Sequence, residues 1–304
     1  MSVFLEILVN DIVPIFLVAF VGWILARRFH VDSKIFSQVG VNALLPCLIF
    51  RTFSTANVNL VESGKIVLFC LLIVIGSGLL ARLVSAWLRL RGAAVTGLML
   101  VVMFTNVGNF GLPIVTFAFG DQALAHATVY FVTMNILLYT IGIAMLTGGR
   151  IAWKKNFIAL LKEPIIIGII LAFLVSQFKF ELPAPVLRSV DLLAQAAIPV
   201  MLLVLGMRFF QSKIEWKPAL WLAVALRLIV IPLVAFPLGQ ALQLSGPAMQ
   251  AGMLQAGTPA GVATTLLATE YDIEPDFVNS VVFLSTLLCG LTLTPLILIF
   301  RNFG

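Results

Sequence analysis

Charged side chains are scarce in this sequence. Only 11% of its 304 residues are Asp, Glu, Lys or Arg, whereas 61% are apolar, and the mean hydropathy is +1.12. A soluble domain carries roughly 25% charged residues. A water-soluble fold cannot bury this much apolar surface, so the composition excludes soluble enzymes and nucleic-acid-binding proteins in spite of the net charge of +6. The lipid bilayer is the predicted surrounding, and no nucleic-acid partner is expected.

The sequence also has few metal ligands and lacks the common catalytic motifs. Its three cysteines, Cys47, Cys70 and Cys289, lie in apolar runs without a CxxC pair, and its two histidines are isolated. We therefore predict no metal site, no cofactor and no enzymatic activity. The patterns HExxH and GxSxG and a Gly-rich nucleotide loop are absent from the sequence. It therefore lacks the catalytic motifs that a membrane-embedded hydrolase would need.

Long apolar runs make up most of the chain. A helical crossing needs about 20 mostly apolar residues, and charged and turn-forming residues leave ten stretches of this kind. The stretches are 3–26, 34–53, 63–88, 93–119, 122–147, 159–179, 187–208, 217–242, 247–270 and 275–300. They show little period-2 alternation, so the predicted fold class is an all-α polytopic membrane protein with ten transmembrane helices.

The placement of Lys and Arg predicts the orientation of the helices. Most of these residues lie in alternate connections, at 27–34, 82–91, 150–162 and 208–217. Because positive residues collect on the cytoplasmic side, these connections are predicted to be inside and both termini outside. The expected location is a plasma membrane or bacterial inner membrane.

An internal repeat divides the chain into halves. Residues 42–46 (Asn-Ala-Leu-Leu-Pro) correspond to 195–199 (Gln-Ala-Ala-Ile-Pro), and 105–108 (Thr-Asn-Val-Gly) to 258–261 (Thr-Pro-Ala-Gly), both at an offset of 153 residues. The predicted repeats are residues 1–149 and 150–304. Five helices in each half place the second repeat in inverted topology, an arrangement typical of secondary transporters.

The fourth and ninth stretches contain the strongest helix breakers. Residues 106–113 hold two glycines, two asparagines and a proline, and residues 257–261 hold two glycines and a proline. Backbone groups freed by a break need partners inside the protein, so breaks in both helices would line a central cavity. Thr258 before Pro259 also resembles an N-cap. Simple proline kinks are the alternative.

Broken helices predict a binding site for an anion. A half-helix N-terminus carries roughly half a positive charge and unpaired N–H groups, which attract a carboxylate. The candidate substrate-binding residues are Thr105, Asn106, Gly108, Asn109, Pro113, Thr258, Pro259 and Gly261. Exposed carbonyls at the breaks could hold a coupling cation, and the choice among sodium, a proton and no ion stays open.

Other polar residues inside the stretches are candidates for a supporting role. They are Asn42, Asn135, Gln195, Gln255 and Arg227. Hydrogen bonds between helices are the alternative for the amides. Arg227 could pair with a substrate carboxylate or with Asp191; a structural salt bridge and a side chain that snorkels to the membrane interface are the alternatives.

These motifs resemble those of the auxin efflux carrier family, which holds plant PIN carriers and bacterial organic-acid permeases. The resemblance covers nearly the whole chain and rests on Asn106-x6-Pro113, 42–46, 268–276 (Ala-Thr-Glu-Tyr-Asp-Ile-Glu-Pro-Asp), 283–286 (Phe-Leu-Ser-Thr) and 294–295 (Thr-Pro). It implies a 5+5 inverted repeat, similar to bile-acid/sodium symporters, with broken helices 4 and 9 crossing. Helices 1, 2, 6 and 7 would be a scaffold, and helices 3–5 and 8–10 a moving transport domain. The family's functional Asn and Pro residues correspond to Asn106, Pro113 and Pro259.

The resemblance also implies a function. We expect a secondary transporter that moves a small organic anion by elevator-type alternating access. A homodimer is one candidate assembly, and the oligomeric state stays open. The long hydrophilic loop of plant members is missing between helices 5 and 6, where 147–157 is short. A small acid such as malate or malonate is therefore expected rather than auxin. A non-transporting receptor or a channel-like protein with a fixed central site is the alternative.

Overall fold

The computed structural model describes residues 3–55, 59–148, 164–178, 180, 182–210 and 214–301. Over these residues the chain is helical, apart from one isolated antiparallel bridge between Thr105 and Ala260. The boundary predicted at 149–150, most of the short connection at 147–157 and the first residues of the stretch 159–179 lie outside the described residues.

The first half of the chain forms helices with short turns of π-helix inserted, labelled η. They are α1 (Val3–Ile7), η1 (Leu8–Ile12), α2 (Val13–Phe29), α3 (Ser33–Val39), η2 (Gly40–Leu44), α4 (Leu45–Thr55), α5 (Leu60–Trp87), α6 (Ala93–Met103), η3 (Val107–Gly111), α7 (Leu112–Leu137), η4 (Leu138–Gly142) and α8 (Ile143–Leu146). Asparagine and aspartate start two of them: Asp32 accepts a hydrogen bond from the Lys34 amide, and Asn59 accepts one from the Val61 amide. Such N-caps satisfy amides that have no partner inside the helix.

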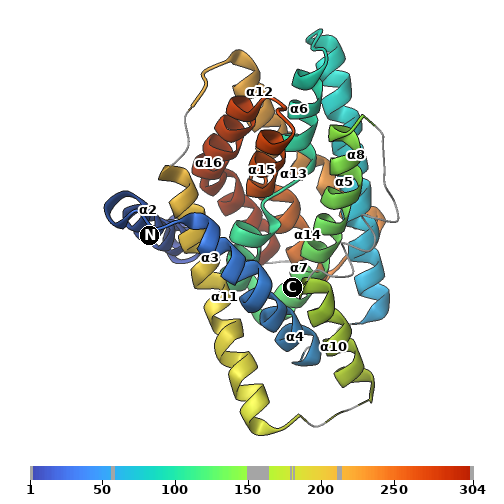
Figure 1. The fold of residues 1–304 in the computed structure, drawn as a ribbon. Helices are drawn as coiled ribbons and strands as arrows, with labels where there is room; N and C mark the ends of the chain where they lie inside the picture. Colours follow the sequence, from blue (N-terminus) through green and yellow to red (C-terminus); the bar gives the residue numbers. More distant parts are fainter. Residues whose placement is uncertain are drawn as a thin grey trace.

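The second half continues in the same way. It contains α10 (Pro164–Phe178), α11 (Ala184–Phe210), α12 (Pro218–Ala225), η5 (Leu226–Val230), α13 (Ile231–Ala241), α14 (Gly246–Gly257), α15 (Val262–Glu270) and α16 (Pro275–Arg301). Figure 1 shows α10 and α11 extending toward the bottom of the view and α6, α12 and α16 toward the top.

Seven helices in the described part of the chain are long and apolar enough to cross a membrane. They are Val3–Phe29, Ser33–Ser54, Leu60–Trp87, Val107–Leu146, Ala184–Phe209, Pro218–Ala241 and Pro275–Arg301. The fourth of these is not straight, because Gly120 has φ 74° and ψ −164° and interrupts α7. Only glycine adopts such a backbone readily. This architecture agrees with the prediction, made from the composition, of an all-helical polytopic membrane protein.

Both helices with clustered breakers are interrupted. α6 ends at Met103 and η3 begins at Val107, while α14 ends at Gly257 and α15 begins at Val262. The first break therefore lies at 104–106, a few residues before Asn109, which already belongs to the second half-helix. Thr258 is not the N-cap that the sequence suggested, because it follows the C-terminal end of α14 and Gly261 precedes α15.

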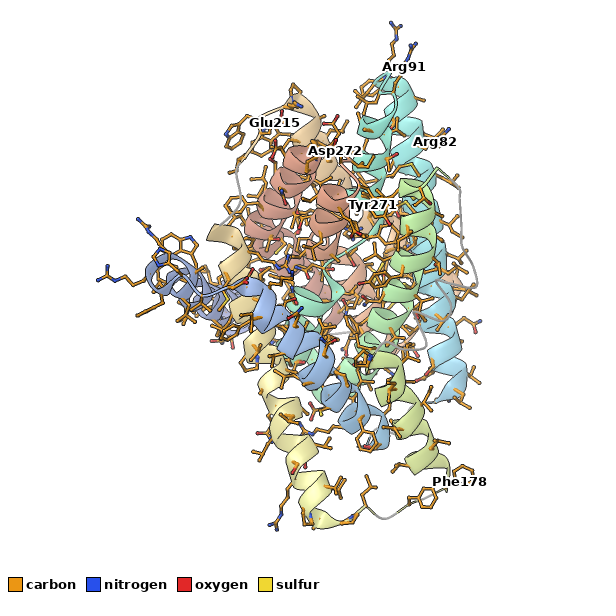
Figure 2. All side chains as sticks on the ribbon, in the orientation of Figure 1. Arg82, Arg91, Phe178, Glu215, Tyr271 and Asp272 are labelled. Carbon is orange, nitrogen blue, oxygen red and sulfur yellow. The ribbon has the colours of Figure 1, made fainter. Side chains whose placement is uncertain are left out.

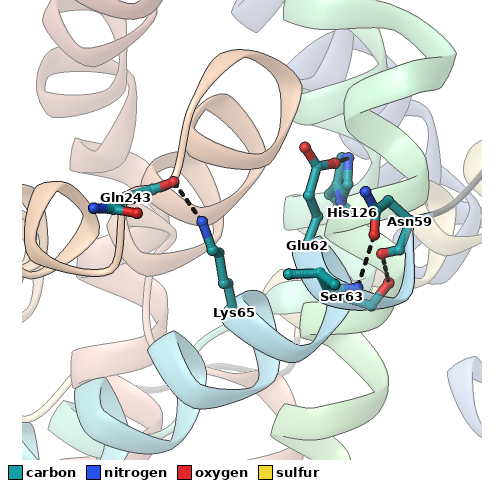
Figure 3. A network of polar contacts seen from close by, with 7 residues as sticks. Asn59, Glu62, Ser63, Lys65, His126 and Gln243 are labelled. Atoms are coloured by element: carbon teal, nitrogen blue, oxygen red, sulfur yellow. Dashed lines mark hydrogen bonds and ion pairs between the residues drawn. The ribbon is translucent and has the colours of Figure 1, made fainter.

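The helices pack in two groups. α11 packs against α2, α3 and α4, and α10 packs against α4; in the other group α14 packs against α5, α7, α13 and α16. At one end of the second group, Glu62 of α5 lies 3.4 Å from His126 of α7, and the Lys65 amine donates to the Gln243 carbonyl over 3.1 Å (Figure 3). These contacts hold α5 to α7 and to the turn between α13 and α14.

The packing of α2 on α11 requires glycine. A Cβ on Gly206 would lie 1.6 Å from the Ala19 carbonyl oxygen, and one on Gly22 would lie 2.1 Å from that of Leu203. Small residues let helix backbones approach in this way, and close approach is what drives helix association in lipid. The two helices thus form a backbone-to-backbone contact that tolerates no side chain.

We expect Gly206→Ala to lower the melting temperature of the purified protein. Overpacking costs about 1–3 kcal/mol, and more where backbone must move. Gly76→Ala is the matched control, because a Cβ there meets nothing within 4 Å. Thermal unfolding in detergent compares the two variants. Equal melting temperatures would contradict the close helix contact.

Candidate functional site

The two helix breaks cross and pair through their backbones. The Asn106 amide donates to the Pro259 carbonyl over 2.8 Å, and the Gly261 amide donates to the Phe104 carbonyl over 2.9 Å. Ser285 of α16 also accepts a hydrogen bond from the Ala260 amide. Gly261 allows this approach, because a Cβ there would lie 3.0 Å from the Thr105 carbonyl oxygen. Two of the backbone groups freed by each break are thus satisfied by the other break, in line with the need of buried peptide groups in a membrane protein for partners.

A cavity of about 180 Å³ lies beside this crossing. Both half-helix N-termini contribute to its wall, η3 through Val107–Asn109 and α15 through Val262–Thr264. The first amides of a helix have no acceptor within the helix. Side chains from α3, η2, α4, α7, η4, α10 and α11 complete the wall; those used below are Asn135 and Arg208.

Two polar side chains at the crossing lie buried without a hydrogen-bond partner among the described residues. They are the Thr105 hydroxyl and the Asn106 amide nitrogen, in residues that are 5% and 4% exposed. Both residues line the cavity. A buried polar group without a partner costs roughly 1–3 kcal/mol. These groups are therefore available to a bound ligand.

The structure brings five of the eight predicted substrate-binding residues to the cavity. Thr105, Asn106, Gly108, Asn109 and Gly261 line it. The other three support the crossing: Pro113 lies in the first turn of α7, the Pro259 carbonyl accepts the Asn106 amide, and Thr258 is fully buried with its hydroxyl donating to the Gln255 carbonyl over 2.7 Å.

The predicted supporting residues divide in the same way. Asn135 lines the cavity and donates to the Phe131 carbonyl over 2.8 Å. Gln255 instead joins α14 to the other half-helix, because its amide nitrogen lies 3.3 Å from the carbonyls of Val107 and Ala127. Asn42 and Gln195 are exposed and do not line the cavity.

Arg227 is also absent from the cavity wall. Its guanidinium donates to backbone carbonyls of Val102, Ala256 and Thr258. The predicted pairing with Asp191 is wrong, since Asp191 lies 3.3 Å from Arg51. Arg227 therefore contacts the C-terminal ends of α6 and α14, whereas the N-terminal ends of η3 and α15 face the cavity.

Sequence reasoning missed Arg208. It lies in the last turn of α11 and is the one charged side chain among the described residues that line the cavity. It also lines a second cavity of about 560 Å³, together with Thr265, Thr269 and Glu270 of α15 and Asn279 of α16. In the sequence Arg208 reads as one more positive residue at a helix end, so only the packing of α11 reveals this position.

A family model described as "Membrane transport protein" matches residues 7–297. The chain belongs to this family. The resemblance to auxin efflux carriers is confirmed, and with it the assignment to membrane transport.

Several relatives agree with this assignment. An uncharacterized transporter of Methanocaldococcus jannaschii is 27% identical over 84% of this chain and 85% of its own length. A Rhizobium meliloti protein named "Putative malonate transporter" is 23% identical over 96% of this chain and 95% of its own length. A rice protein named "Probable auxin efflux carrier component 1c" is 27% identical over 45% of this chain and 24% of its own length.

Replacing Asn106 with Ala should weaken binding of an anion to the transporter. Losing a hydrogen bond to a charged group costs about 1.5–3 kcal/mol, which is roughly a tenfold to hundredfold rise in Kd. The backbone bond from residue 106 to Pro259 does not involve the side chain, so folding should persist. Asn42→Ala, at an exposed position, is the control. Unchanged affinity in the Asn106 variant would assign this side chain a structural role only.

Proposed function

We propose that this protein is a secondary transporter of a small organic anion in the cell membrane. The observation that carries the proposal is the charge of the cavity. Two half-helix N-termini and Arg208 face it, whereas no described acidic side chain lines it. Each N-terminus contributes roughly half a positive charge. Such a wall favours an anion over a cation or a neutral solute.

A short carboxylate fits this site best. The Thr105 hydroxyl and the Asn106 amide are neutral donors beside the helix N-termini, and Arg208 offers a planar donor group that matches a carboxylate. The Rhizobium meliloti relative bears a malonate transporter's name and spans nearly the same length. We infer a small acid of the malonate or malate type as substrate.

Arg208→Gln should reduce uptake of the transported acid at least tenfold, because a charge-assisted hydrogen bond of about 1.5–3 kcal/mol is lost. Arg208→Lys keeps the charge and should retain part of the activity. Arg28→Gln is the control, since Arg28 is exposed on α2. The uptake rate of each variant is measured in proteoliposomes over a panel of radiolabelled acids. A neutral amide analogue of the transported acid tests whether the site requires a negative charge. Transport of the neutral analogue at the same rate would contradict an anion site.

We infer ten crossings in two inverted repeats of five, divided near residue 149. The interruption of α7 at Gly120 supports this, because it splits the segment Val107–Leu146 into two lengths. The mutual bridge of Thr105 and Ala260 supports the repeat, because these residues lie at nearly equivalent positions of the two halves. Both termini would lie outside the cell.

The two groups of helices support an elevator mechanism. α1–α4, α10 and α11 would form the scaffold, and α5–α8 with α12–α16 the transport domain. The second cavity shares Arg208, Val262 and Leu266 with the first and reaches Glu270 at the end of α15. Figure 2 labels Arg82, Arg91, Glu215 and Asp272 toward that end of the molecule, opposite Phe178. The positive-inside rule assigns the Arg-rich end to the cytoplasm. The conformation would then be open toward the inside.

An ion pair crosses the proposed boundary between scaffold and transport domain. Arg301 at the end of α16 donates to the Asp11 carboxylate in η1 over 2.8 Å. Sliding of one domain against the other would separate the two residues. Their contact therefore serves as a reporter of the inward-open state.

A crosslink at this contact should arrest transport. Cysteines replacing Asp11 and Arg301, in a background without Cys47, Cys70 and Cys289, are joined by a short bifunctional maleimide in proteoliposomes. We expect uptake to fall with the fraction crosslinked, because alternating access requires the motion that the link blocks. The uncrosslinked double variant is the control. Full uptake by completely crosslinked protein would favour the alternative, a receptor or channel-like protein with a fixed central site.

A homodimer remains a prediction. The exposed amides of Asn42 and Gln195, at equivalent positions of the two repeats, are suited to contacts between subunits within the membrane.

A further inference from the structure

Arg227 is the largest side chain that is fully buried in the structure. It lies in η5, between α12 and α13, and is 0% exposed. A charge deep in a membrane protein is costly unless it is paired. None of the ion pairs in the described part of the chain includes Arg227. Some other negative group must therefore stabilise it.

Backbone carbonyls at the two helix breaks supply that negative charge. The Nη1 group donates to Val102, in the last turn of α6, over 3.0 Å, and the Nη2 group donates to Ala256, in the last turn of α14. Nε donates to Thr258, directly after α14, over 3.1 Å. The last carbonyls of a helix have no acceptor role within it. One guanidinium thus binds the open C-terminal ends of both half-helices.

The charges at these ends match. Each helix C-terminus carries roughly half a negative charge, so two of them balance one guanidinium. A pair of converging carbonyl ends is also the feature that would otherwise bind a small metal cation, since hard cations prefer oxygen ligands. Here three of those carbonyls are already used by Arg227.

We propose that Arg227 is a permanent internal counter-cation of the helix crossing, which takes the place of a transported cation, so that anion uptake needs no sodium. The sodium part rests on the proposed function. The structural part does not, because it concerns the stability of the crossing alone. The residue is a positioning residue: it holds the C-terminal ends of α6 and α14, the half-helices that directly precede η3 and α15, whose N-termini face the cavity.

The sodium part is tested with the native protein. Uptake of radiolabelled malonate and of radiolabelled malate is measured in proteoliposomes with sodium replaced by choline on both sides, and then with an inward sodium gradient. We expect equal initial rates under all conditions. An increase of about tenfold or more with the gradient, equivalent to about 1.4 kcal/mol, would overturn it.

The counter-cation role is tested by chemical rescue. Arg227→Met removes the charge, and the melting temperature of the purified variant is measured with and without millimolar guanidinium, using tetramethylammonium at the same concentration as the ionic-strength control. Guanidinium should raise the melting temperature of this variant alone. The matched control is Arg28→Met, which removes an arginine that is exposed on α2.

Two results would overturn the role of Arg227. One is an Arg227→Met protein as stable as the wild type without added cation. The other is an Arg227→Lys protein that is no more stable than Arg227→Met, since Lys keeps the charge at this place. Failure of the Met variant to fold while the Lys variant folds would support the charge requirement. If no acid is transported, the proposed function fails, but the melting experiments still decide the role of Arg227.

Discussion

The structure depends on two backbone hydrogen bonds between the breaks of two interrupted helices. The amides of Asn106 and Gly261 donate to the carbonyls of Pro259 and Phe104, so each break satisfies the other. In lipid an unsatisfied peptide group costs several kcal/mol, and a single broken helix would not persist there. The crossing therefore explains why both breaks are present and why they must meet. It also places two half-helix N-termini, those of η3 and α15, at the wall of the cavity beside it.

The crossing gives the interior an electrical polarity. The N-terminal ends of η3 and α15 face the cavity, while the C-terminal ends of α6 and α14 face Arg227. Two arginines consequently have opposite roles. Arg208 adds positive charge to the cavity wall, and Arg227 balances negative charge at the other ends. The wall that we propose to bind an anion thus has a single charged side chain among its described residues.

Much of this could be predicted from the sequence because the responsible features are local. Apolar length predicts spanning helices, and the clusters of Gly, Asn and Pro at 106–113 and 257–261 predict the breaks. Asn106 and Thr105 could be predicted as substrate-binding residues because a polar side chain next to a helix break in the membrane is a candidate for contact with a ligand. The prediction of Thr258 as an N-cap is wrong, because a Thr-Pro pair is compatible both with the end of one half-helix and with the start of the next.

By itself, the sequence determined the membrane environment, the helical class, the two breaks and the family, all of which follow from composition, spacing or matched motifs along the chain. Only the tertiary structure decided which polar residues reach the cavity. Asn42 and Gln195 look equivalent to Asn135 in sequence, yet helix rotation leaves them exposed, and Arg208 reaches the cavity because α11 packs beside η3. Which way a helix face points is set by its neighbours, and for helices apolar on all sides the sequence carries little periodic signal to reveal it.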